Sequence, residues 1–424
     1  MDKELIKRVI LKYGSLVPND IVPRQLVLEQ NKLDKAITII GPRRAGKSYY
    51  LYSVFGKTKK PVFLNFEDNL LQGIKAEDLE LVKDSAKELF GSEELTYFFD
   101  EIQEVDDWEN FIVTLINEHK KVYLSGSNSK LLSKEISTSL RGKSLPYLIM
   151  PFSFQEFLGF KKVKVDDKSL LTDEVFEIKK LFKEYLDFGG FPEIVATKEL
   201  SLKARLIASY YDSIIYKDLV DRLKMKNTEL VKTLINYTLS NYASMFSISQ
   251  LEKHLKITKT PYSLEDVYLI LDSLKDIFFT FYVKQYSRSF KKTRLSKAKV
   301  YLVDNAYIQF LSRDSDANGR KLENTVFVEL FRRAGNVENK NIFYFIGKNE
   351  CDFVVEEQNS KQLIQVCYNL DENSRRREID GLSEAMTFFK KKNGLILTLD
   401  QEEEIILSDK IITVKPVWKW LLSK

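Results

Sequence analysis

The chain has 424 residues, of which 44% are hydrophobic and 30% charged, so its composition is that of a folded protein, and its length predicts about two to four domains at roughly 150 residues each. Its two cysteines, Cys351 and Cys367, and its two histidines, His119 and His254, are too few for a disulfide framework or a His-rich metal centre, and they disfavour a Ser-His-Asp triad. The 66 basic residues exceed the 61 acidic residues by five, which permits an anionic partner without requiring one.

No stretch of the sequence approaches the roughly 18 consecutive apolar residues that a membrane-spanning helix needs. The first residues, MDKELIKRVILKY, mix charged with apolar side chains and do not form a signal-peptide pattern. We therefore expect a cytoplasmic protein without membrane contact.

Residues 36 to 150 alternate short strand-like runs with helical stretches. The strand-like runs are AITIIG, PVFLNF, LTYFFD, KVYLSGS and LPYLIM. Apolar runs of this length separated by helices are typical of a parallel sheet with crossover helices. We therefore predict an α/β fold over residues 1–150, in a layout typical of a nucleotide-binding domain.

Three further modules are predicted after residue 150. Helical periodicity dominates residues 151–240 and is interrupted by FGGFP at 188–192, which indicates a helical lid. In residues 241–319, two helical segments precede the strand-like runs IFFTFYVKQY and KVYLVD, which predicts a winged helix with a basic loop between its strands. Residues 320–424 read as a helix, the strands NIFYFIG, DFVVEE and LIQVCYN, another helix and LILTL, a smaller α/β domain.

The motif GPRRAGKS, residues 41–48, follows the run AITII and precedes the helical run SYYLYSVF. It matches the phosphate-binding motif G-x-x-x-x-G-K-S in the strand, loop and helix context that the motif requires. Its glycines let backbone N–H groups surround phosphates, and the helix N-terminus adds partial positive charge. We predict that ATP binds here, with Lys47 on the β- and γ-phosphates and Ser48 on Mg²⁺. The predicted nucleotide-binding residues are Gly41, Pro42, Arg43, Arg44, Ala45, Gly46, Lys47, Ser48, Tyr49 and Asn128.

The run LTYFFD ends at Asp100 and is followed by Glu101. A strand that ends in two carboxylates places both at the carboxyl edge of the sheet, where ligands bind in open α/β folds. We predict that Asp100 belongs to the Mg²⁺ shell and that Glu101 is the general base for the attacking water. Without the phosphate loop, the same pair would indicate only an acidic turn.

The run KVYLSGSNS ends in Ser125, Ser127 and Asn128, which lie beside Asp100 if the two strands are neighbours. A polar group there would sense the γ-phosphate or the water, and the alternative is an ordinary serine-rich turn. Arg141, in SLRGKS, is predicted to be an arginine finger that stabilises transition-state charge. The alternative for Arg141 is a solvated side chain or a salt bridge.

Ten segments resemble those of a family of archaeal and bacterial AAA+-like P-loop ATPases. They are GPRRAGKS, FLNFED (63–68), FFDEIQ (98–103), LSGSNSKLL (124–132), SLRGKS (139–144), PFSFQEF (151–157), FGGFPE (188–193), KVYLVDNA (299–306), LENTVFVEL (322–330) and ECDFVV (350–355). The resemblance spans nearly the whole chain. It implies ATP binding and hydrolysis, with an arginine supplied in trans by a homo-oligomer or a protein partner. It also implies a winged helix followed by a restriction-endonuclease-like domain of the PD-(D/E)XK type.

The resemblance also implies where a nuclease site would lie. An intact nuclease of that type combines a helix glutamate, a strand aspartate and Glu-x-Lys on the next strand to hold Mg²⁺ and a water. Here Glu323 or Glu329 is the helix acid and Asp352 the strand acid, but Gln-Val-Cys at 365–367 replaces Glu-x-Lys. We expect an inactive domain that serves for binding, while a site built from Asp352, Glu329 and other acids stays an alternative.

A basic segment over residues 284–299 contains no acid. Its cationic residues are Lys284, Arg288, Lys291, Lys292, Arg294, Lys297 and Lys299. On the loop of a winged helix these side chains would neutralise phosphates of duplex DNA, and the alternative is a solvated loop. We expect Tyr286 and Phe290, interleaved with them, to serve for packing. A second cluster, Arg375 to Arg377, follows later in the chain.

The sequence thus predicts a Mg²⁺-dependent ATPase that couples ATP binding and hydrolysis to conformational change on or near DNA. Two alternatives stay open. One is an ATP-controlled switch or scaffold whose C-terminal domain binds a protein partner. The other is an ATP-regulated nuclease.

Overall fold

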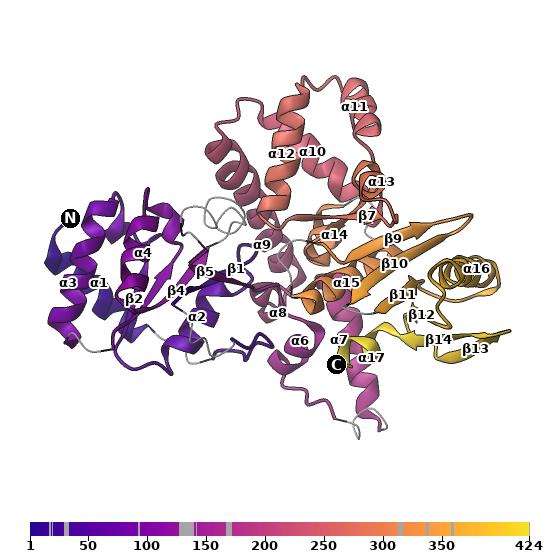
Figure 1. The fold of residues 1–424 in the computed structure, drawn as a ribbon, viewed down its shortest axis with the longest axis horizontal. Coiled ribbons are helices and arrows are strands. Elements are labelled where there is room, and N and C mark those ends of the chain that lie inside the picture. Colours follow the sequence, from indigo (N-terminus) through magenta and orange to yellow (C-terminus); the bar gives the residue numbers. More distant parts are fainter. Residues whose placement is uncertain are drawn as a thin grey trace. The chain divides into compact units, whose positions relative to one another are not determined.

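The computed structural model describes residues 1–16, 18, 20–28, 34–91, 94–126, 140, 142–166, 172–312, 317–335, 339–357 and 360–423. The chain divides into two compact units, Met1–Met150 with Asp276–Phe278 and Pro151–Lys275 with Phe279–Lys424 (Figure 1). We call them unit 1 and unit 2.

Unit 1 contains a five-stranded sheet in which every pairing is parallel, so the predicted parallel α/β sheet is confirmed. The strands lie in the order β2-β3-β4-β1-β5. Their bounds are β1 (Ala36–Ile40), β2 (Pro61–Asn65), β3 (Thr96–Asp100), β4 (Lys121–Gly126) and β5 (Ser144–Leu148). Because β4 lies between β1 and β3, the end of β1, which leads into the predicted phosphate loop, and the end of β3, which carries Asp100, lie on either side of the end of β4.

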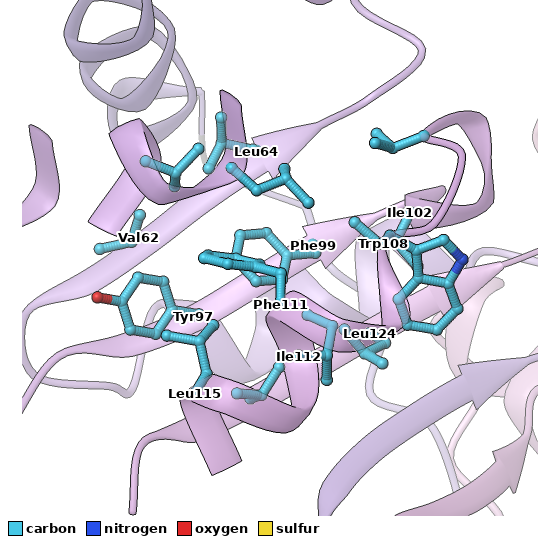
Figure 2. Close-up of a cluster of buried hydrophobic side chains, with 14 of the residues drawn as sticks. Val62, Leu64, Tyr97, Phe99, Ile102, Trp108, Phe111, Ile112, Leu115 and Leu124 are labelled. Atoms are coloured by element: carbon cyan, nitrogen blue, oxygen red, sulfur yellow. The ribbon is translucent and has the colours of Figure 1, made fainter. Parts of the chain in front are cut away.

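Helices cover both faces of this sheet. They are α1 (Lys3–Ser15), α2 (Lys47–Phe55), α3 (Leu79–Phe90) and α4 (Glu109–Asn117), with short 3-10 turns η1 (Asn69–Leu71), η2 (Ala76–Asp78) and η3 (Ile102–Glu104). Tyr97 and Phe99 of β3 join the core that contains Phe111 of α4, as Figure 2 shows. Phe98 faces the opposite side, where its ring lies 5.6 Å from that of Phe55 in α2. Side chains that alternate in this way bury both faces of the strand, at about 1.5–3 kcal/mol for each large apolar side chain.

Unit 2 begins with helices, as predicted for residues 151–240. They are α6 (Phe154–Phe160), α7 (Glu174–Phe188), α8 (Pro192–Ala196), α9 (Leu200–Ser213), the π-helix η5 (Ile214–Asp221) and α10 (Thr228–Ser240). The predicted interruption lies between α7 and α8, where Pro192 is the first residue of the new helix. Proline suits this position because its missing N–H would have no helical partner there.

The rest of unit 2 is built on a nine-stranded sheet in the order β13-β14-β12-β11-β10-β9-β7-β8-β6. Its strands are β6 (Ser244–Phe246), β7 (Thr280–Gln285), β8 (Ala298–Leu302), β9 (Ile342–Ile346), β10 (Glu350–Glu357), β11 (Ser360–Val366), β12 (Asn393–Thr398), β13 (Glu403–Leu407) and β14 (Lys410–Pro416). The associated helices are α11 (Ile248–Ile257), α12 (Leu264–Asp276), α13 (Phe290–Leu295), α14 (Asn305–Leu311), α15 (Asn318–Ala334), α16 (Glu372–Phe389) and α17 (Val417–Leu422).

Two features of this sheet differ from the sequence-based expectations. β7 pairs with β9 in parallel, so the segments assigned to a winged helix (241–319) and to a nuclease-like domain (320–424) share one sheet within one compact unit. The connection between β7 and β8 is not a plain basic loop, because it contains α13. The order helix, three strands, helix, strand after residue 318 matches the expectation, and α16 lies over β10, β11 and β12 (Figure 1).

Several segments of the family resemblance meet inside unit 2 through backbone hydrogen bonds. Asp304 accepts from the backbone N–H groups of Gly190 at 2.7 Å and Ala306 at 2.9 Å. Arg332 donates to the carbonyl oxygen of Pro151 at 2.8 Å. Because Asp304 is buried and both side chains bond to chain segments far apart in sequence, these contacts hold the fold together.

Gly41, the first residue after β1, lies against the backbone of Ile149. Ile149 donates its N–H to the carbonyl oxygen of Ile40 at 2.7 Å. Gly41 has a φ of 144°, and a Cβ atom there would lie 1.9 Å from the carbonyl oxygen of Ile149. Any other residue would have to displace this backbone.

We therefore expect Gly41→Ala to lower the free energy of unfolding of unit 1 by about 2–4 kcal/mol, through backbone strain and overpacking. Urea denaturation followed by circular dichroism measures this change. Gly14→Ala is the matched control, because nothing lies within 4 Å of a Cβ at Gly14 in α1, and it is expected to stabilise by about 0.5–1 kcal/mol. Equal stability of the two variants would contradict the contact with Ile149.

Candidate functional site

The predicted phosphate loop connects β1 to α2, as its motif requires. Gly46 caps the N-terminus of α2 with a φ of 94°, and Lys47 is the first residue of the helix. Arg44 also has a left-handed backbone, with a φ of 63°. The loop thus leads its backbone N–H groups into a helix N-terminus, which is an arrangement that binds anions.

The side chain of Lys47 is buried, with 4% of its surface exposed. Its Nζ atom lies 3.1 Å from the carbonyl oxygen of Pro42 and 3.9 Å from Oε1 of Glu101. Burial lowers the pKa of Lys47, and the charges of Glu101 and Asp100 act in the opposite direction. The ammonium group therefore lies between the loop and the two carboxylates, where it can neutralise phosphate charge.

Asp100 ends β3 as a fully buried carboxylate. Its Oδ1 accepts a hydrogen bond from the Ser125 hydroxyl at the end of β4, and its Oδ2 lies 3.3 Å from Nδ2 of Asn65 at the end of β2. Burial raises the pKa of Asp100 to about 6, with a further contribution from Glu101, whereas hydrogen bonds from Ser125 and Ser48 act against the rise. The predicted proximity of Ser125 and Asp100 is confirmed.

Glu101 follows with a left-handed φ of 52°, which turns its side chain out of the strand direction. Its backbone N–H donates to Oγ of Ser125 at 3.2 Å, and its Oε2 accepts from the side-chain amide of Gln103. Hydrogen bonds thus fix both the backbone and the carboxylate of Glu101. A carboxylate held beside a lysine at a sheet edge is suited to activate a water.

The residues around Asp100 also fit a magnesium ion. Ser48 hydrogen-bonds to Asp100, so a hydroxyl and a carboxylate lie together at the start of α2. Mg²⁺ prefers oxygen ligands and is commonly held by one or two protein groups, with waters and phosphates completing its shell. No group of three or more His, Cys, Asp or Glu side chains suited to a metal occurs among the described residues.

The remaining predicted site residues differ in how far the structure places them. Arg43 lies 3.4 Å from Oε1 of Glu67, and Arg44 is exposed. Tyr49 is 56% exposed on α2. Ser127, Asn128 and Arg141 lie outside the described residues.

Four residues near the loop were not assigned from the sequence. Asn65 ends β2, Glu67 follows β2, and Gln103 follows β3. All three belong to segments quoted for the resemblance, and a polar residue at or after a strand end is the sequence signal that could have identified them. Arg24 had no sequence signal. Its guanidinium donates to the carbonyl oxygens of Ala45 at 2.9 Å and Met150 at 2.5 Å, so it fastens the phosphate loop to the chain after β5.

A second buried cluster of charges lies in unit 2. Lys299 Nζ lies 2.9 Å from Oε1 of Glu323 and 2.9 Å from Oδ1 of Asp352, and it also contacts Glu350. Burial would lower the pKa of Lys299, but Asp352 and Glu323 outweigh it and hold the pKa well above the ordinary value. Tyr301 donates to Oε1 of Glu323 at 2.6 Å. The structure thus brings Glu323 and Asp352 together around an ammonium group.

Glu329, the other candidate for the helix acid, lies elsewhere. It pairs with Arg332 at 2.5 Å and with Arg333 at 2.8 Å. Gln365 occupies the expected strand position, where its Oε1 accepts from the backbone N–H of Asp352 at 3.2 Å and its Nε2 donates to Glu378 at 2.5 Å. The pairing of Asp352 with Glu329 in one site is therefore wrong.

The prediction that the whole basic segment faces DNA is wrong for Lys299. This side chain is 3% exposed because its ammonium group is bound by the acidic cluster. Lys284 is partly buried, and burial lowers its pKa. The exposed cations that remain are Arg288, Lys291, Lys292, Arg294 and Lys297. Tyr286 packs 4.7 Å from the ring of Phe389, which confirms its role in packing.

The second arginine cluster is paired within the chain. Arg375 lies 2.6 Å from Glu403, Arg376 lies 3.7 Å from Asp380, and Arg377 lies 2.6 Å from Glu378. Separately, none of the helices in the described ranges has the length and apolar character needed to cross a bilayer.

Comparison with known proteins supports the assignment of unit 1. Residues 33–158 match an AAA domain, and residues 179–318 match a domain of unknown function, DUF8612. An uncharacterized protein of Methanocaldococcus jannaschii is 36% identical over 98% of both chains. An uncharacterized protein of Haemophilus influenzae is 31% identical over 94% of this chain and 97% of its own length.

Solved structures give weaker likenesses. Cdc6p from Pyrobaculum aerophilum is 9% identical with a TM-score of 0.26, covering 79% of this chain and 94% of its own. AMPPCP-bound DnaA from Aquifex aeolicus is 15% identical with a TM-score of 0.22, covering 65% of this chain and 84% of its own. These scores are too low to establish a shared fold. By its full-length relatives, the chain belongs to the same family as the Methanocaldococcus and Haemophilus proteins, and its N-terminal part is an AAA-type P-loop ATPase domain.

Proposed function

We propose that the protein is a Mg²⁺-dependent ATPase that binds ATP at the loop between β1 and α2 and hydrolyses it there. The observation that carries this proposal is the convergence of Lys47, Asp100 and Glu101 on one sheet edge, with 3.9 Å between Lys47 Nζ and Glu101 Oε1. A phosphate loop, a buried strand-end carboxylate and a second carboxylate beside it are the parts that ATP hydrolysis requires.

In this proposal each side chain has a separate task. Backbone N–H groups of residues 41–47, apart from Pro42, which has none, hold the phosphates, and Lys47 neutralises their charge. Glu101 takes a proton from a water, and the water oxygen then attacks the γ-phosphorus. Ser48 and Asp100 would hold Mg²⁺, which supplies positive charge to the phosphate oxygens when bound. The assignment of Arg141 as an arginine finger stays a prediction.

We further propose that unit 2 contacts duplex DNA through the exposed cations of the basic segment. Arg288, Lys291, Lys292, Arg294 and Lys297 are exposed and lie on α13 or directly beside it. Exposed cations of this density neutralise phosphates without reading the base sequence.

α12 is a poorer DNA-binding element than α13. Its exposed apolar residues are Leu264, Tyr268 and Leu269, and its exposed residues also include the acids Glu265 and Asp272. Negative charge on this face opposes the approach of phosphates. We therefore assign DNA contact to the connection between β7 and β8.

We propose that the nuclease-like part of unit 2 does not cleave DNA. Its helix and strand acids, Glu323 and Asp352, bond to Lys299, and Gln365 supplies an amide where a third carboxylate would be needed. A cation of the chain itself thus balances the acids that would otherwise bind a metal. The protein-binding switch stays the alternative function, and it predicts an ATPase rate that DNA does not change.

Two variants test the ATPase assignment. Lys47→Ala is expected to remove most ATP affinity, because the ammonium group facing the phosphates is lost. Glu101→Gln is expected to bind ATP with unchanged affinity and to hydrolyse it about 10²–10⁴-fold more slowly. Fluorescent-nucleotide titration and phosphate release measure the two effects. Normal hydrolysis by Glu101→Gln would show that the base lies elsewhere.

The pH dependence of binding tests the role of Asp100. Its pKa is raised from 3.8 to about 6, so the affinity for Mg·ATP should fall about tenfold for each pH unit below 6, as the metal-binding carboxylate is protonated. Between pH 3.8 and 6 the folded state binds this proton more tightly than the unfolded state, so protonation of Asp100 favours folding and cannot explain the loss. Asp100→Asn should bind weakly at every pH, and a wild-type affinity independent of pH would contradict the assignment.

A charge-reversal triple tests DNA contact. Changing Lys291, Lys292 and Arg294 to Glu should weaken duplex binding by at least about tenfold and flatten its salt dependence, because phosphate contacts are lost. The matched control reverses three exposed lysines of unit 1, Lys57, Lys59 and Lys60, and should retain binding. Fluorescence anisotropy across a salt series gives both results, and the same duplex should remain intact with Mg²⁺. Equal loss in both triples would leave only a net-charge effect and contradict the assignment to α13.

A further inference from the structure

Gln103, two residues after Glu101, contacts the proposed general base directly. It lies in the 3-10 turn η3, which begins immediately after Glu101. Its Nε2 atom donates a hydrogen bond to Oε2 of Glu101, while Oε1 of Glu101 lies 3.9 Å from Nζ of Lys47. Each oxygen of the carboxylate thus faces a group with positive character.

The contact fixes the orientation of the Gln103 amide. Turning the amide over would place its oxygen against Oε2 of Glu101, and two acceptors without a proton between them repel each other. The nitrogen therefore faces Glu101. The amide oxygen necessarily points away from the carboxylate.

This amide oxygen, Oε1 of Gln103, is buried and has no hydrogen-bond partner among the described residues. A buried acceptor without a partner lowers the stability of the fold. A methionine of the same length would avoid this penalty. The stability of the turn therefore does not explain a glutamine here, whereas its hydrogen bond to Glu101 does.

The backbone of Glu101 is already fixed without Gln103. Its N–H donates to Ser125, and its carbonyl oxygen accepts from the N–H of Glu104 at 3.1 Å. The remaining freedom of Glu101 lies in its side-chain torsions. The amide of Gln103 restricts these torsions, since it bonds to the end of the side chain.

We propose that Gln103 is a positioning residue for ATP hydrolysis, whose amide N–H holds the Glu101 carboxylate in the orientation that accepts a proton from the attacking water. This inference rests on the proposed ATPase function. In that step a water O–H bond breaks and its proton goes to Glu101. The water oxygen bonds to the γ-phosphorus, the bond from that phosphorus to the bridging oxygen breaks, and its electron pair leaves on ADP. Glu101 then returns its proton to solvent.

Gln103→Met tests the inference because it keeps the length of the side chain and removes the donor. We expect kcat for Mg·ATP to fall about 10- to 100-fold, as a misplaced catalytic group predicts. The Kd for a non-hydrolysable ATP analogue should not change, and the urea midpoint of unfolding should stay equal or rise. Gln72→Met is the matched control, because Gln72 is exposed in the same unit, and it should leave all three quantities unchanged.

A double variant separates action through Glu101 from an independent effect. If Gln103 acts by orienting Glu101, then Glu101→Gln combined with Gln103→Met should be no slower than Glu101→Gln alone. A further slowing in the double variant would overturn the inference. A Gln103→Met protein with a lowered unfolding midpoint would also overturn it, because the amide would then act through the fold.

The outcomes distinguish this inference from the function on which it rests. A wild-type chain without ATP turnover, or a Glu101→Gln variant with full kcat, would defeat the ATPase proposal and the inference with it. An inactive Glu101→Gln variant together with a Gln103→Met variant of wild-type kcat would defeat the inference alone.

Discussion

The buried carboxylate of Asp100 is the constraint on which the arrangement of unit 1 depends. Removing a charge from water is costly, and the cost is offset only when hydrogen-bond donors surround it. Here the donors come from elements on both sides of β3: Asn65 ends β2, Ser125 ends β4, and Ser48 lies in the first turn of α2. The neighbouring strands must therefore end at the same level for this group to stay charged. The strand order that places these donors around Asp100 is therefore also the order that builds the site at the sheet edge. For this reason, unit 1 has a formed site once it is folded.

The elements of unit 1 and the identity of its main side chains could be predicted because their signals are local. Strand-like runs, a glycine-rich loop and an acidic pair are each read from a few adjacent residues. Arg24 could not be predicted, since its role is defined by carbonyl groups at Ala45 and Met150. The prediction that Lys299 faces DNA was wrong for the same reason. The residues next to Lys299 in the sequence are basic, but those next to it in space are Glu323, Glu350 and Asp352. Likewise, the sequence did not decide whether Glu323 or Glu329 is the helix acid. The side chain of Glu323 bonds to Lys299 and that of Glu329 to Arg333, and the spacing of the two residues along α15 does not predict these partners.

The organisation of unit 2 shows where periodicity stops being informative. Each strand and helix has its own hydrophobic pattern, but nothing in the sequence of β7 or of β9 indicates that these two strands pair with each other. The domain boundary that the hydrophobic periodicity predicts between residues 319 and 320 therefore divides strands that belong to one continuous sheet. A count of basic residues likewise does not predict which cations are available to a partner. Arg375 and Arg377 are bonded to Glu403 and Glu378, whereas the cations near α13 are exposed.

The clamp made by Arg24 affects how unit 1 can be excised. The part of the chain that matches the AAA domain, residues 33–158, does not include Arg24. The guanidinium of Arg24 nevertheless bonds to the phosphate loop at Ala45 and to the segment after β5 at Met150. The same omission removes Leu26, whose carbonyl oxygen accepts from the Tyr50 hydroxyl of α2 at 3.1 Å. A fragment cut at the matched limits would leave these groups without partners. A fragment of this chain that keeps these hydrogen bonds must therefore begin before residue 24, upstream of the matched limit at residue 33.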